Sequence, residues 1–520
     1  MSTTGAVLIH ASPLPPVEIP DVPLTEFVLG RATELADKPA LIDGPSGRTL
    51  TYAQLAAGVA SLAGGLAARG FGPGNVLAIM APNIPEYAVV FHGVAMAGAT
   101  ITTINPTYTQ GEVHHQLVDS AATIMVTIPM FLDVARAAIV GTSVEEIFVF
   151  GEAEGALPVT ALFGPPLAEQ VPVTPDTVVV LPYSSGTTGL AKGVMLTHRN
   201  LVANVAQTLA PAALREDETI IAVLPFFHIY GMQVLMNCGL AAGATIVTMP
   251  RFDLEQFLQL HQEHGITRSF VAPPIVVAFA KHPMVDNYDL SKLEQIFSGA
   301  APLSAELALE TGARLGCEVV QGYGMTEMSP VSHLTPVGMG KPGSCGVTAP
   351  NTETMIVDPS TGESLGVDLD GEVWVRGPQV MVGYLNNPEA TAATIDAEGW
   401  IHTGDIGHID ADGHLYVVDR LKELIKYKGF QVPPAELEAL LLTHPAVADA
   451  AVIGRPDDEA GEVPIGFVVL KPGQTATAEE IMEFVAGQGA GYKQIRAIIF
   501  LDAVPKSASG KILRRVLRDG

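Results

Sequence analysis

The chain has 520 residues, of which 48% are hydrophobic and 16% charged, and its formal net charge is −27. This length predicts two or more folded cores, and the composition is not that of a disordered chain. The negative charge argues against a general affinity for nucleic acid or anionic membranes, both of which need a basic surface.

The charge is unevenly distributed along the chain. Residues 420–520 hold 13 Lys and Arg against 13 Asp and Glu, whereas residues 1–419 hold 15 against 42. A polyanionic ligand would therefore be repelled by the long part and find its local cations in the short one.

The cysteines and the start of the chain indicate a reducing compartment. Cys238, Cys317 and Cys345 are too few and too scattered for a disulfide framework or a zinc site. No lysine or arginine precedes Arg31, so the charged start of a signal peptide is missing, and no apolar run is long enough to cross a bilayer. We expect a cytoplasmic protein without a membrane span.

The first half of the chain alternates candidate helices and strands. After a proline-rich arm at 13–23, apolar residues three and four apart predict an amphipathic helix from Tyr52 to Leu66. A helix is expected at 85–96, and strands are expected at 76–81, 99–105, 124–128, 178–182, 222–225, 244–249 and 269–274. This alternation predicts an α/β fold with parallel sheets covered by helices.

The texture of the sequence changes twice in the second half. From about Asn351, short strands separated by turns predict an antiparallel subdomain. After Asp419, a helix-and-strand segment ends in a basic tail. The predicted fold is therefore a large N-terminal domain (1–419) of stacked α/β subdomains plus a β-rich subdomain, and a small α+β C-terminal domain (420–520), with the boundary near 420–422.

One loop has the composition of a phosphate-binding segment. Residues 183–193 read YSSGTTGLAKG and follow the apolar run TVVVLP. A glycine-rich turn after a strand can direct backbone N–H groups at a phosphate, while hydroxyls donate further bonds and Lys192 adds a positive charge. The segment is not a Walker A loop. Taken alone, its composition is equally compatible with a flexible connection.

Seven motifs, in order, resemble those of the adenylate-forming enzymes, the superfamily of acyl-CoA synthetases, peptide-synthetase adenylation domains and firefly luciferase. They are YSSGTTGLAKG, PFFHIYG (225–231), SGAAPLS (298–304), QGYGMTE (321–327), GWIHTGD (399–405), VDRLKELIKYKGFQVPPAELE (418–438) and PKSASGK (505–511). The chain is most similar to the 4-coumarate–CoA ligases, chiefly through KELIKYKGFQVPPAELE and FHIYG.

The sequence departs from the family pattern at Ala191, a position that relatives usually fill with proline. Loss of the ring frees φ and raises the entropy of the open loop. We therefore expect weaker or slower handling of the nucleotide and retention of the site.

The resemblance implies a reaction in two steps, with ATP, Mg²⁺ and coenzyme A as cofactors and a small carboxylic acid as substrate. The carboxylate attacks the α-phosphorus of MgATP to give an acyl-adenylate and pyrophosphate, and the thiol of CoA then displaces AMP. Both reactants of the first step are anions, so the site must supply preorganised positive potential.

The resemblance also implies roles for residues around the nucleotide. The β- and γ-phosphates would be held by Ser184, Ser185, Gly186, Thr187, Thr188, Gly189 and Lys192. Glu327 would bind Mg²⁺ and Thr326 the α-phosphate; the adenine would lie against Ala300, Gln321, Gly322 and Tyr323, and the ribose against Asp405 and Arg420. Outside this framework, Glu327 would be a solvated residue and Asp405 a turn former.

Lys511 is the expected catalytic lysine. In SASGK, flexible Ser and Gly residues would let its ammonium bridge the substrate carboxylate and the α-phosphate; the alternative is a solvated lysine in a basic tail. The family further implies a mobile C-terminal domain that rotates about Lys422. The rotation would bring Lys426 and Gln431 to the adenylate and Lys428 and Gly429 to CoA, whose phosphates would meet Arg251, otherwise an ordinary surface arginine.

The acyl pocket is expected beside His228, which would gate and orient the substrate unless it is a core histidine. Positions that match the hydroxycinnamate pocket of plant relatives are Tyr230, Val234, Gly299, Gly324, Pro330 and Val331. Some of those relatives carry a serine in place of Val234. We therefore expect cinnamate or another apolar aryl or medium-chain acid to be accepted as well as 4-coumarate.

Two other functions remain open from the sequence. The shared motifs do not encode pocket length, so a medium-chain fatty acyl-CoA synthetase is an alternative, as is a catalytically silent ATP or acyl-adenylate binding protein. A peptide-synthetase module is disfavoured, because no carrier domain follows Lys511 and FFHIYGM has no acidic residue to bind an amino group.

Overall fold

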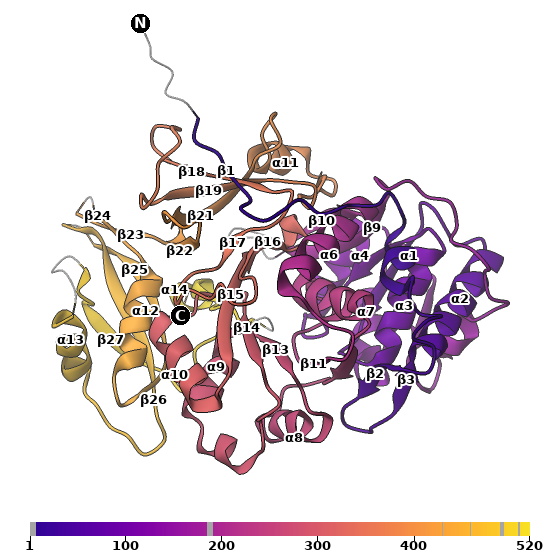
Figure 1. The fold of residues 1–520 in the computed structure, drawn as a ribbon, viewed down its shortest axis with the longest axis horizontal. Coiled ribbons are helices and arrows are strands. Elements are labelled where there is room, and N and C mark those ends of the chain that lie inside the picture. Colours follow the sequence, from indigo (N-terminus) through magenta and orange to yellow (C-terminus); the bar gives the residue numbers. More distant parts are fainter. Residues whose placement is uncertain are drawn as a thin grey trace, which may run out of the picture.

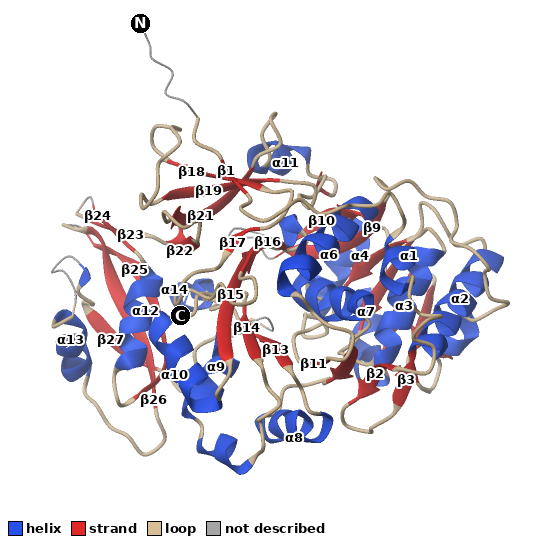
Figure 2. Cartoon of the chain, in the orientation of Figure 1, coloured by secondary structure: helices blue, strands red, loops and turns tan. Residues whose placement is uncertain are grey.

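A computed structural model describes residues 7–184, 191–428, 430–457, 459–488, 493–507 and 510–519. These residues form four β-sheets with helices packed on them (Figures 1 and 2). The architecture confirms the predicted mixture of a large α/β part, an antiparallel β-rich part and a small α+β part. None of the helices in these ranges is both long and apolar enough to cross a membrane.

The first large sheet has eight strands in the order β20-β10-β9-β5-β4-β6-β7-β8. They are β4 (Val76–Met80), β5 (Thr100–Thr103), β6 (Ile124–Thr127), β7 (Glu146–Val149), β8 (Leu157–Pro158), β9 (Val178–Ser184), β10 (Lys192–Thr197) and β20 (Gly383–Tyr384). The strands from β9 to β8 run parallel, whereas β10 returns antiparallel to β9 and pairs with β20. Ser184 and Lys192 therefore lie opposite each other at the end of a hairpin.

The second large sheet has nine strands in the order β17-β16-β15-β14-β13-β11-β12-β2-β3. They are β2 (Pro39–Asp43), β3 (Thr49–Thr51), β11 (Thr219–Ala222), β12 (Thr245–Thr248), β13 (Arg268–Val271), β14 (Gln295–Ser298), β15 (Glu318–Gly324), β16 (Val331–Leu334) and β17 (Val347–Thr348). The strands from β15 to β2 are parallel. Ligands of such sheets bind beyond the carboxyl ends of the strands.

Helices cover both sheets. They are α1 (Leu24–Leu29), α2 (Tyr52–Ala68), α3 (Pro85–Met96), α4 (Gln110–Ser120), α5 (Leu132–Ala138), α6 (His198–Ala212), α7 (Cys238–Ala242), α8 (Leu254–His264), α9 (Pro273–Lys281), α10 (Ala305–Leu315) and α11 (Pro388–Thr394). Shorter or wider turns are η1 (Pro129–Phe131), η2 (Val159–Leu162), η3 (Tyr230–Asn237, a π-helix), η4 (Pro283–Asn287) and η5 (Thr326–Met328). Thr51, Thr109 and Thr197 begin α2, α4 and α6 with capping boxes.

Two of the expected strands are displaced. The strand expected at 222–225 lies at 219–222, because the buried amide of Asn83 donates to the carbonyls of Ala222 and Leu224 and turns the chain out of the ladder. The strand expected at 269–274 ends at Val271, and Pro273 and Pro274 instead begin α9, where proline fits the first turn.

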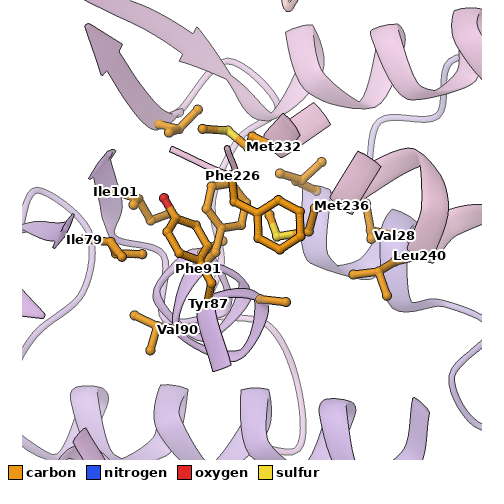
Figure 3. Close-up of a cluster of buried hydrophobic side chains, with 14 of the residues drawn as sticks. Val28, Ile79, Tyr87, Val90, Phe91, Ile101, Phe226, Met232, Met236 and Leu240 are labelled. Carbon is orange, nitrogen blue, oxygen red and sulfur yellow. The ribbon is translucent and has the colours of Figure 1, made fainter. Parts of the chain in front are cut away.

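The main core lies where α3 packs against the eight-stranded sheet and the segment η3–α7. Figure 3 shows Tyr87 and Phe91 of α3 beside Phe226, Met232 and Met236. The rings of Tyr87 and Phe226 lie 5.7 Å apart and are tilted by 58°. This packing ties the segment 226–236 to the sheet that carries β9.

The third sheet is antiparallel, with five strands in the order β1-β18-β19-β21-β22. They are β1 (His10–Ala11), β18 (Glu353–Val357), β19 (Gly371–Arg376), β21 (Ile401–Ile409) and β22 (Leu415–Arg420). β1 comes from the start of the chain, and its His10 pairs with Thr354. The proline-rich arm that follows is held by Asn351, whose side chain bonds both N–H and carbonyl of Val17.

The fourth sheet is built entirely from residues after Arg420 and has the order β24-β23-β26-β25, with β27 parallel to β26. Its strands are β23 (Ile425–Tyr427), β24 (Phe430–Val432), β25 (Val447–Asp457), β26 (Gly461–Leu470) and β27 (Ala497–Phe500), and its helices are α12 (Pro434–Thr443), α13 (Ala478–Ala486) and α14 (Arg514–Asp519). The change of sheet falls between β22 and β23. The boundary near 420–422 stays a prediction that this change of sheet supports.

Candidate active site

A buried carboxylate joins the phosphate-loop hairpin to η5. Glu327 Oε1 accepts hydrogen bonds of 2.9 Å from Ser184 Oγ, at the end of β9, and from the hydroxyl of Tyr384 in β20. The ammonium of Lys192 lies 4.4 Å from the centre of the Tyr384 ring, a cation–π contact. Ser184, Lys192 and Glu327 therefore lie together, as the sequence predicts for a triphosphate and its metal.

Glu327 fits the metal ligand that the sequence predicts. Only 6% of its surface is exposed, and both of its hydrogen bonds from described residues go to Oε1. Among the described residues, no hydrogen bond to its second oxygen is present, and carboxylate oxygen is the ligand that Mg²⁺ prefers. The neighbouring Thr326 is half-buried in the same turn.

A second carboxylate is fixed between β15 and β22. Asp405 in β21 accepts a 2.6 Å hydrogen bond from the hydroxyl of Tyr323, and Arg420 Nε lies 3.3 Å from its other oxygen. Burial, followed by the charge of Asp405, raises the pKa of Tyr323, so this hydroxyl stays a donor. The tyrosine ring and Asp405 are thus held together where adenine and ribose are expected.

The other predicted adenine residues lie at the carboxyl ends of β14 and β15. The amide of Gln321 bonds the N–H and carbonyl of Leu303, so its side chain fixes the SGAAPLS segment. A Cβ on Gly322 would lie 2.7 Å from the Phe297 ring, so glycine is needed there. Ala300 has a positive φ of 72°, which directs the backbone after β14.

Lys511 enters this site from the C-terminal segment. Burial lowers the pKa of its ammonium and Arg420 lowers it further, while the charges of Asp405 and Glu327 raise it. Lys511 therefore lies within reach of the charges of these three residues. The preceding Gly510 has a φ of 84°, and a Cβ there would lie 3.1 Å from the Cβ of Ala272, ahead of α9. The lysine of the last motif is thus docked on the N-terminal part.

His228 lies beside Lys511, in the loop that Asn83 shapes. Burial, followed by the charge of Lys511, lowers the pKa of His228 to about 3, so the ring is neutral at physiological pH. Its Nδ1 accepts a 3.3 Å hydrogen bond from the N–H of Tyr230. The proton of the neutral ring is therefore on Nε2, which can donate.

The ring of Tyr230 contacts one predicted acyl-pocket residue, Gly299, and shares an apolar cluster with Val234 and Val331. A Cβ on Gly299 would lie 2.7 Å from this ring, and the Tyr230 hydroxyl donates to the carbonyl of Phe297 at 3.2 Å. Val234, one helical turn further along η3, is 3% exposed in the same apolar cluster. On β15 and β16, a Cβ at Gly324 would overlap the carbonyl of Pro330, and both backbone groups of Val331 bond the Asn204 side chain.

The structure does not bring the residues expected for the second step to this site. Lys426 and Gln431 face each other across the β23–β24 hairpin, and Lys428 follows with a φ of 47°. Figure 1 shows this hairpin at the outer edge of the molecule, well away from β14 and β15. The hairpin thus lies apart from the site that Lys511 enters.

The predicted hinge lies in an exposed turn. Lys422 is exposed between β22 and β23, and Leu421 N–H donates to the Gly404 carbonyl at 2.8 Å. Asp419 of β22 accepts a 2.8 Å hydrogen bond from Ala435 N–H at the start of α12. Arg251 is also exposed, beyond the carboxyl end of β12. The remaining predicted positions, Ser185, Gly186, Thr187, Thr188, Gly189 and Gly429, lie outside the described residues.

Tyr384 and Asn83 contact or shape the site but were not predicted from the sequence. Tyr384 reaches Glu327 and Lys192 only because β20 pairs with β10, nearly two hundred residues earlier. Asn83 follows β4 and positions the loop that carries His228 through three hydrogen bonds. In the sequence, Asn83 could have been recognised as a single amide residue that follows a strand of buried apolar residues.

Comparisons with known proteins agree with this arrangement. The family model described as AMP-binding enzyme matches residues 30–385, and that of the AMP-binding enzyme C-terminal domain matches residues 436–511. The chain is 45% identical to 4-coumarate–CoA ligase 2 of Nicotiana tabacum, over 98% of this chain and 97% of the relative. It is 46% identical to 4-coumarate–CoA ligase 5 of Oryza sativa subsp. japonica, over 100% and 98%.

Solved structures share the fold over nearly the whole chain. The anthranilate CoA ligase AuaEII, in complex with anthranoyl-AMP, superimposes with a TM-score of 0.90 at 26% identity, covering 96% of this chain and 97% of that one. ATP-bound MatB from Rhodopseudomonas palustris gives 0.87 at 29% identity, covering 96% and 99%. With both family models matched in order and relatives 45% and 46% identical over nearly the whole chain, the chain belongs to the AMP-binding, adenylate-forming enzyme family.

Proposed function

We propose that this protein is an ATP-dependent acid–CoA ligase that forms an acyl-adenylate and then an acyl-CoA thioester, acting on 4-coumarate- and cinnamate-type aryl acids. The observation that carries the proposal is the docking of the Lys511 segment on Ala272, within reach of the charges of Asp405, Glu327 and Arg420. The 4-coumarate–CoA ligases that match the chain along their full length support the substrate class.

Adenylation requires that two anions meet, and Lys511 is the group that we propose brings them together. Burial and Arg420 lower the pKa of its ammonium in this structure. An incoming carboxylate and α-phosphate would favour the charged form, because opposite charges nearby stabilise it. The ammonium would hold one oxygen of each reactant and stabilise the charge that develops between them.

His228 would orient the substrate carboxylate. A neutral imidazole with its proton on Nε2 can donate to one carboxylate oxygen without adding a charge beside Lys511. Because Asn83 and Tyr87 fix the loop and the core beneath it, this donor is held in place before the substrate arrives. The ring of Tyr230, packed against Gly299, would then form one wall for the aromatic ring of the acid.

The nucleotide would lie across the carboxyl ends of β9 and β15. Ser184 and Lys192 would contact the β- and γ-phosphates, Thr326 the α-phosphate, and Asp405 the ribose hydroxyls with Tyr323 beneath the base. Glu327 would hold Mg²⁺, which neutralises charge on the phosphate oxygens when bound. Gln321 would act by holding the SGAAPLS segment that carries Ala300.

Thioester formation would follow a rotation of residues 420–520 against residues 1–419 about Lys422. The turn at 421–424 is where the chain passes from the third sheet to the fourth. After rotation, Lys426 and Gln431 would approach the adenylate, with Lys428 and Gly429 near CoA and Arg251 near its phosphates. The Asp419–Ala435 hydrogen bond crosses the turn and would have to be replaced.

A panel of carboxylic acids tests the function directly. The full chain is incubated with MgATP, CoA and one acid at a time, and pyrophosphate release and CoA consumption are both recorded. We expect both signals with 4-coumarate and cinnamate, and pyrophosphate release that depends on the acid. Exclusive activity with medium-chain fatty acids would overturn the substrate class, and absence of acid-dependent turnover with every acid would overturn the ligase assignment.

A further inference from the structure

Helix α4 packs beside the β9–β10 hairpin and carries two polar side chains that reach it. His115 and Asp119 are four residues apart, a spacing that places both on one face of the helix. With Lys192 and Asn386 they line a polar hollow of about 360 Å³. Neither residue belongs to the motifs that carry the family resemblance.

His115 fixes the residue that precedes Lys192. Its Nε2 lies 3.2 Å from the carbonyl oxygen of Ala191. A carbonyl can only accept a hydrogen bond, so this nitrogen is the donor. The bond therefore restrains the chain directly before the ammonium that lies over the Tyr384 ring.

Asp119 holds two further segments near the same hollow, one through Tyr183 and one through Asn386. Its Oδ2 accepts a 2.7 Å hydrogen bond from the hydroxyl of Tyr183, and Asn386 Nδ2 donates to its Oδ1 and its carbonyl, each at 3.1 Å. The Tyr183 ring reaches Asp119 across Gly193, where a Cβ would lie 3.1 Å from the ring. Glycine at 193 leaves the room that this contact needs.

We propose that His115 and Asp119 are positioning residues for triphosphate binding. They act through neighbours of Ser184 and Lys192, which we assign to the triphosphate, and of Tyr384, which bonds the proposed metal ligand. Tyr183 precedes Ser184, Ala191 precedes Lys192, and Asn386 follows Tyr384 by two positions. The inference rests on the proposed function, because it takes the triphosphate to bind at Ser184 and Lys192.

The hydrogen bond to Ala191 also restrains the backbone at a position where alanine itself does not. A proline ring at this position would fix φ, whereas Ala191 leaves φ free. Here His115 supplies a restraint from a neighbouring helix instead. Restraining binding groups before the ligand arrives lowers the entropy that binding must overcome.

The test compares an ATP analogue with AMP, because AMP lacks the β- and γ-phosphates that Ser184 and Lys192 would hold. Dissociation constants of a non-hydrolysable ATP analogue and of AMP are measured by calorimetry on the full chain with Mg²⁺. His115→Ala should weaken the analogue about threefold to tenfold, the effect of one hydrogen bond, and leave AMP unchanged. The matched control is His114→Ala, since His114 bonds the carbonyl of Ala138 on α5 and should leave both constants unchanged.

Two further variants separate positioning from a general loss of structure. Tyr183→Phe removes only the hydroxyl that donates a hydrogen bond to Asp119. It should also weaken binding of the analogue and leave AMP binding unchanged. Adding Ala191→Pro to His115→Ala should restore binding of the analogue, because the ring replaces the lost restraint. Thermal unfolding of each variant establishes that it is folded.

The outcomes distinguish this inference from the proposed function. An equal loss for AMP and the analogue, or no loss in His115→Ala and Tyr183→Phe, overturns the positioning role. A proline that leaves the His115→Ala defect unchanged overturns the restraint at Ala191. If the unaltered protein binds neither nucleotide, the proposed function itself fails.

Discussion

Ser184 Oγ donates a 2.9 Å hydrogen bond to Glu327 Oε1, across 143 residues of sequence. The bond links the hairpin of the eight-stranded sheet to the turn that follows β15 of the nine-stranded sheet. A proposed triphosphate contact and the proposed metal ligand are thus positioned by each other. A substitution of either residue should therefore change how the other side chain is positioned, so the tests of the site begin with this pair.

Removing the charge of Glu327 should raise the Mg²⁺ requirement more than removing one of its partners. Tyr384→Phe deletes the hydroxyl that bonds Glu327 and keeps the ring under Lys192. We expect it to raise the Mg²⁺ concentration for half-maximal pyrophosphate release by about tenfold to a hundredfold, the range for a lost outer partner. Glu327→Gln should exceed this. A Mg²⁺ dependence that is unchanged in Glu327→Gln would refute the metal site.

Lys511→Ala should slow adenylation by about a hundredfold to a thousandfold, the typical cost of removing one preorganised donor to developing charge. Thioester formation from a supplied acyl-adenylate should be nearly unaffected, since we assign that step to the hairpin of Lys426. Both half-reactions are followed separately, by pyrophosphate release and by CoA consumption. Full adenylation in the variant would remove the basis of the proposed mechanism.

The pH dependence of adenylation should report on the same lysine. Burial and Arg420 lower the pKa of Lys511 from the ordinary value of 10.5. The charged form is the one required, so kcat/KM for the acid should fall as the pH rises through this lowered pKa. In Arg420→Gln one positive neighbour is gone, and the alkaline limb should move to higher pH. An alkaline limb that stays at the same pH in Arg420→Gln would show that Arg420 does not lower the pKa of Lys511.

Tyr323→Phe removes the 2.6 Å hydrogen bond to Asp405 and keeps the ring. Asp405 would lose part of its orientation, so AMP should bind about threefold to tenfold more weakly. The loss of affinity should be smaller for 2′,3′-dideoxy-AMP, which has no ribose hydroxyls to donate hydrogen bonds to Asp405. Equal losses for the two nucleotides would place the effect on the base and not on the ribose.

Two glycines near the expected acyl pocket should tolerate an added methyl group differently. At Gly299 the new Cβ would press on the Tyr230 ring, which can shift, so we expect a cost of about 1 kcal/mol and altered acid selectivity. At Gly324 it would overlap the backbone carbonyl of Pro330, and the cost should reach or exceed about 3 kcal/mol. Thermal unfolding of Gly299→Ala and Gly324→Ala makes the comparison, and the reverse order would contradict it.

The sequence predicted elements well where local chemistry decides them. The helix at 85–96 was placed correctly because Pro85 fits its first turn and the following strand begins after a glycine. The strand expected at 222–225 was misplaced because its end is set by the Asn83 side chain, from a segment 139 residues away. Such a contact leaves no trace in local periodicity.

The site shows the same division. The roles of Glu327 and Asp405, which lie within the motifs, come from the resemblance and stay predictions that their contacts with Ser184 and Tyr323 support. Tyr384 was missed because its position depends on the pairing of β20 with β10. His115 and Asp119 were missed because only the packing of α4 brings them to the hairpin.

The strand β1 closes the edge of the sheet that carries Asp405, yet Ser12 beside it bonds Thr348, 336 residues later. During synthesis at about 5–20 residues per second, the start of the chain must wait roughly 20–70 s for its partner to emerge from the ribosome. The sheet that carries Asp405 is therefore among the last parts of the molecule that a growing polypeptide can finish.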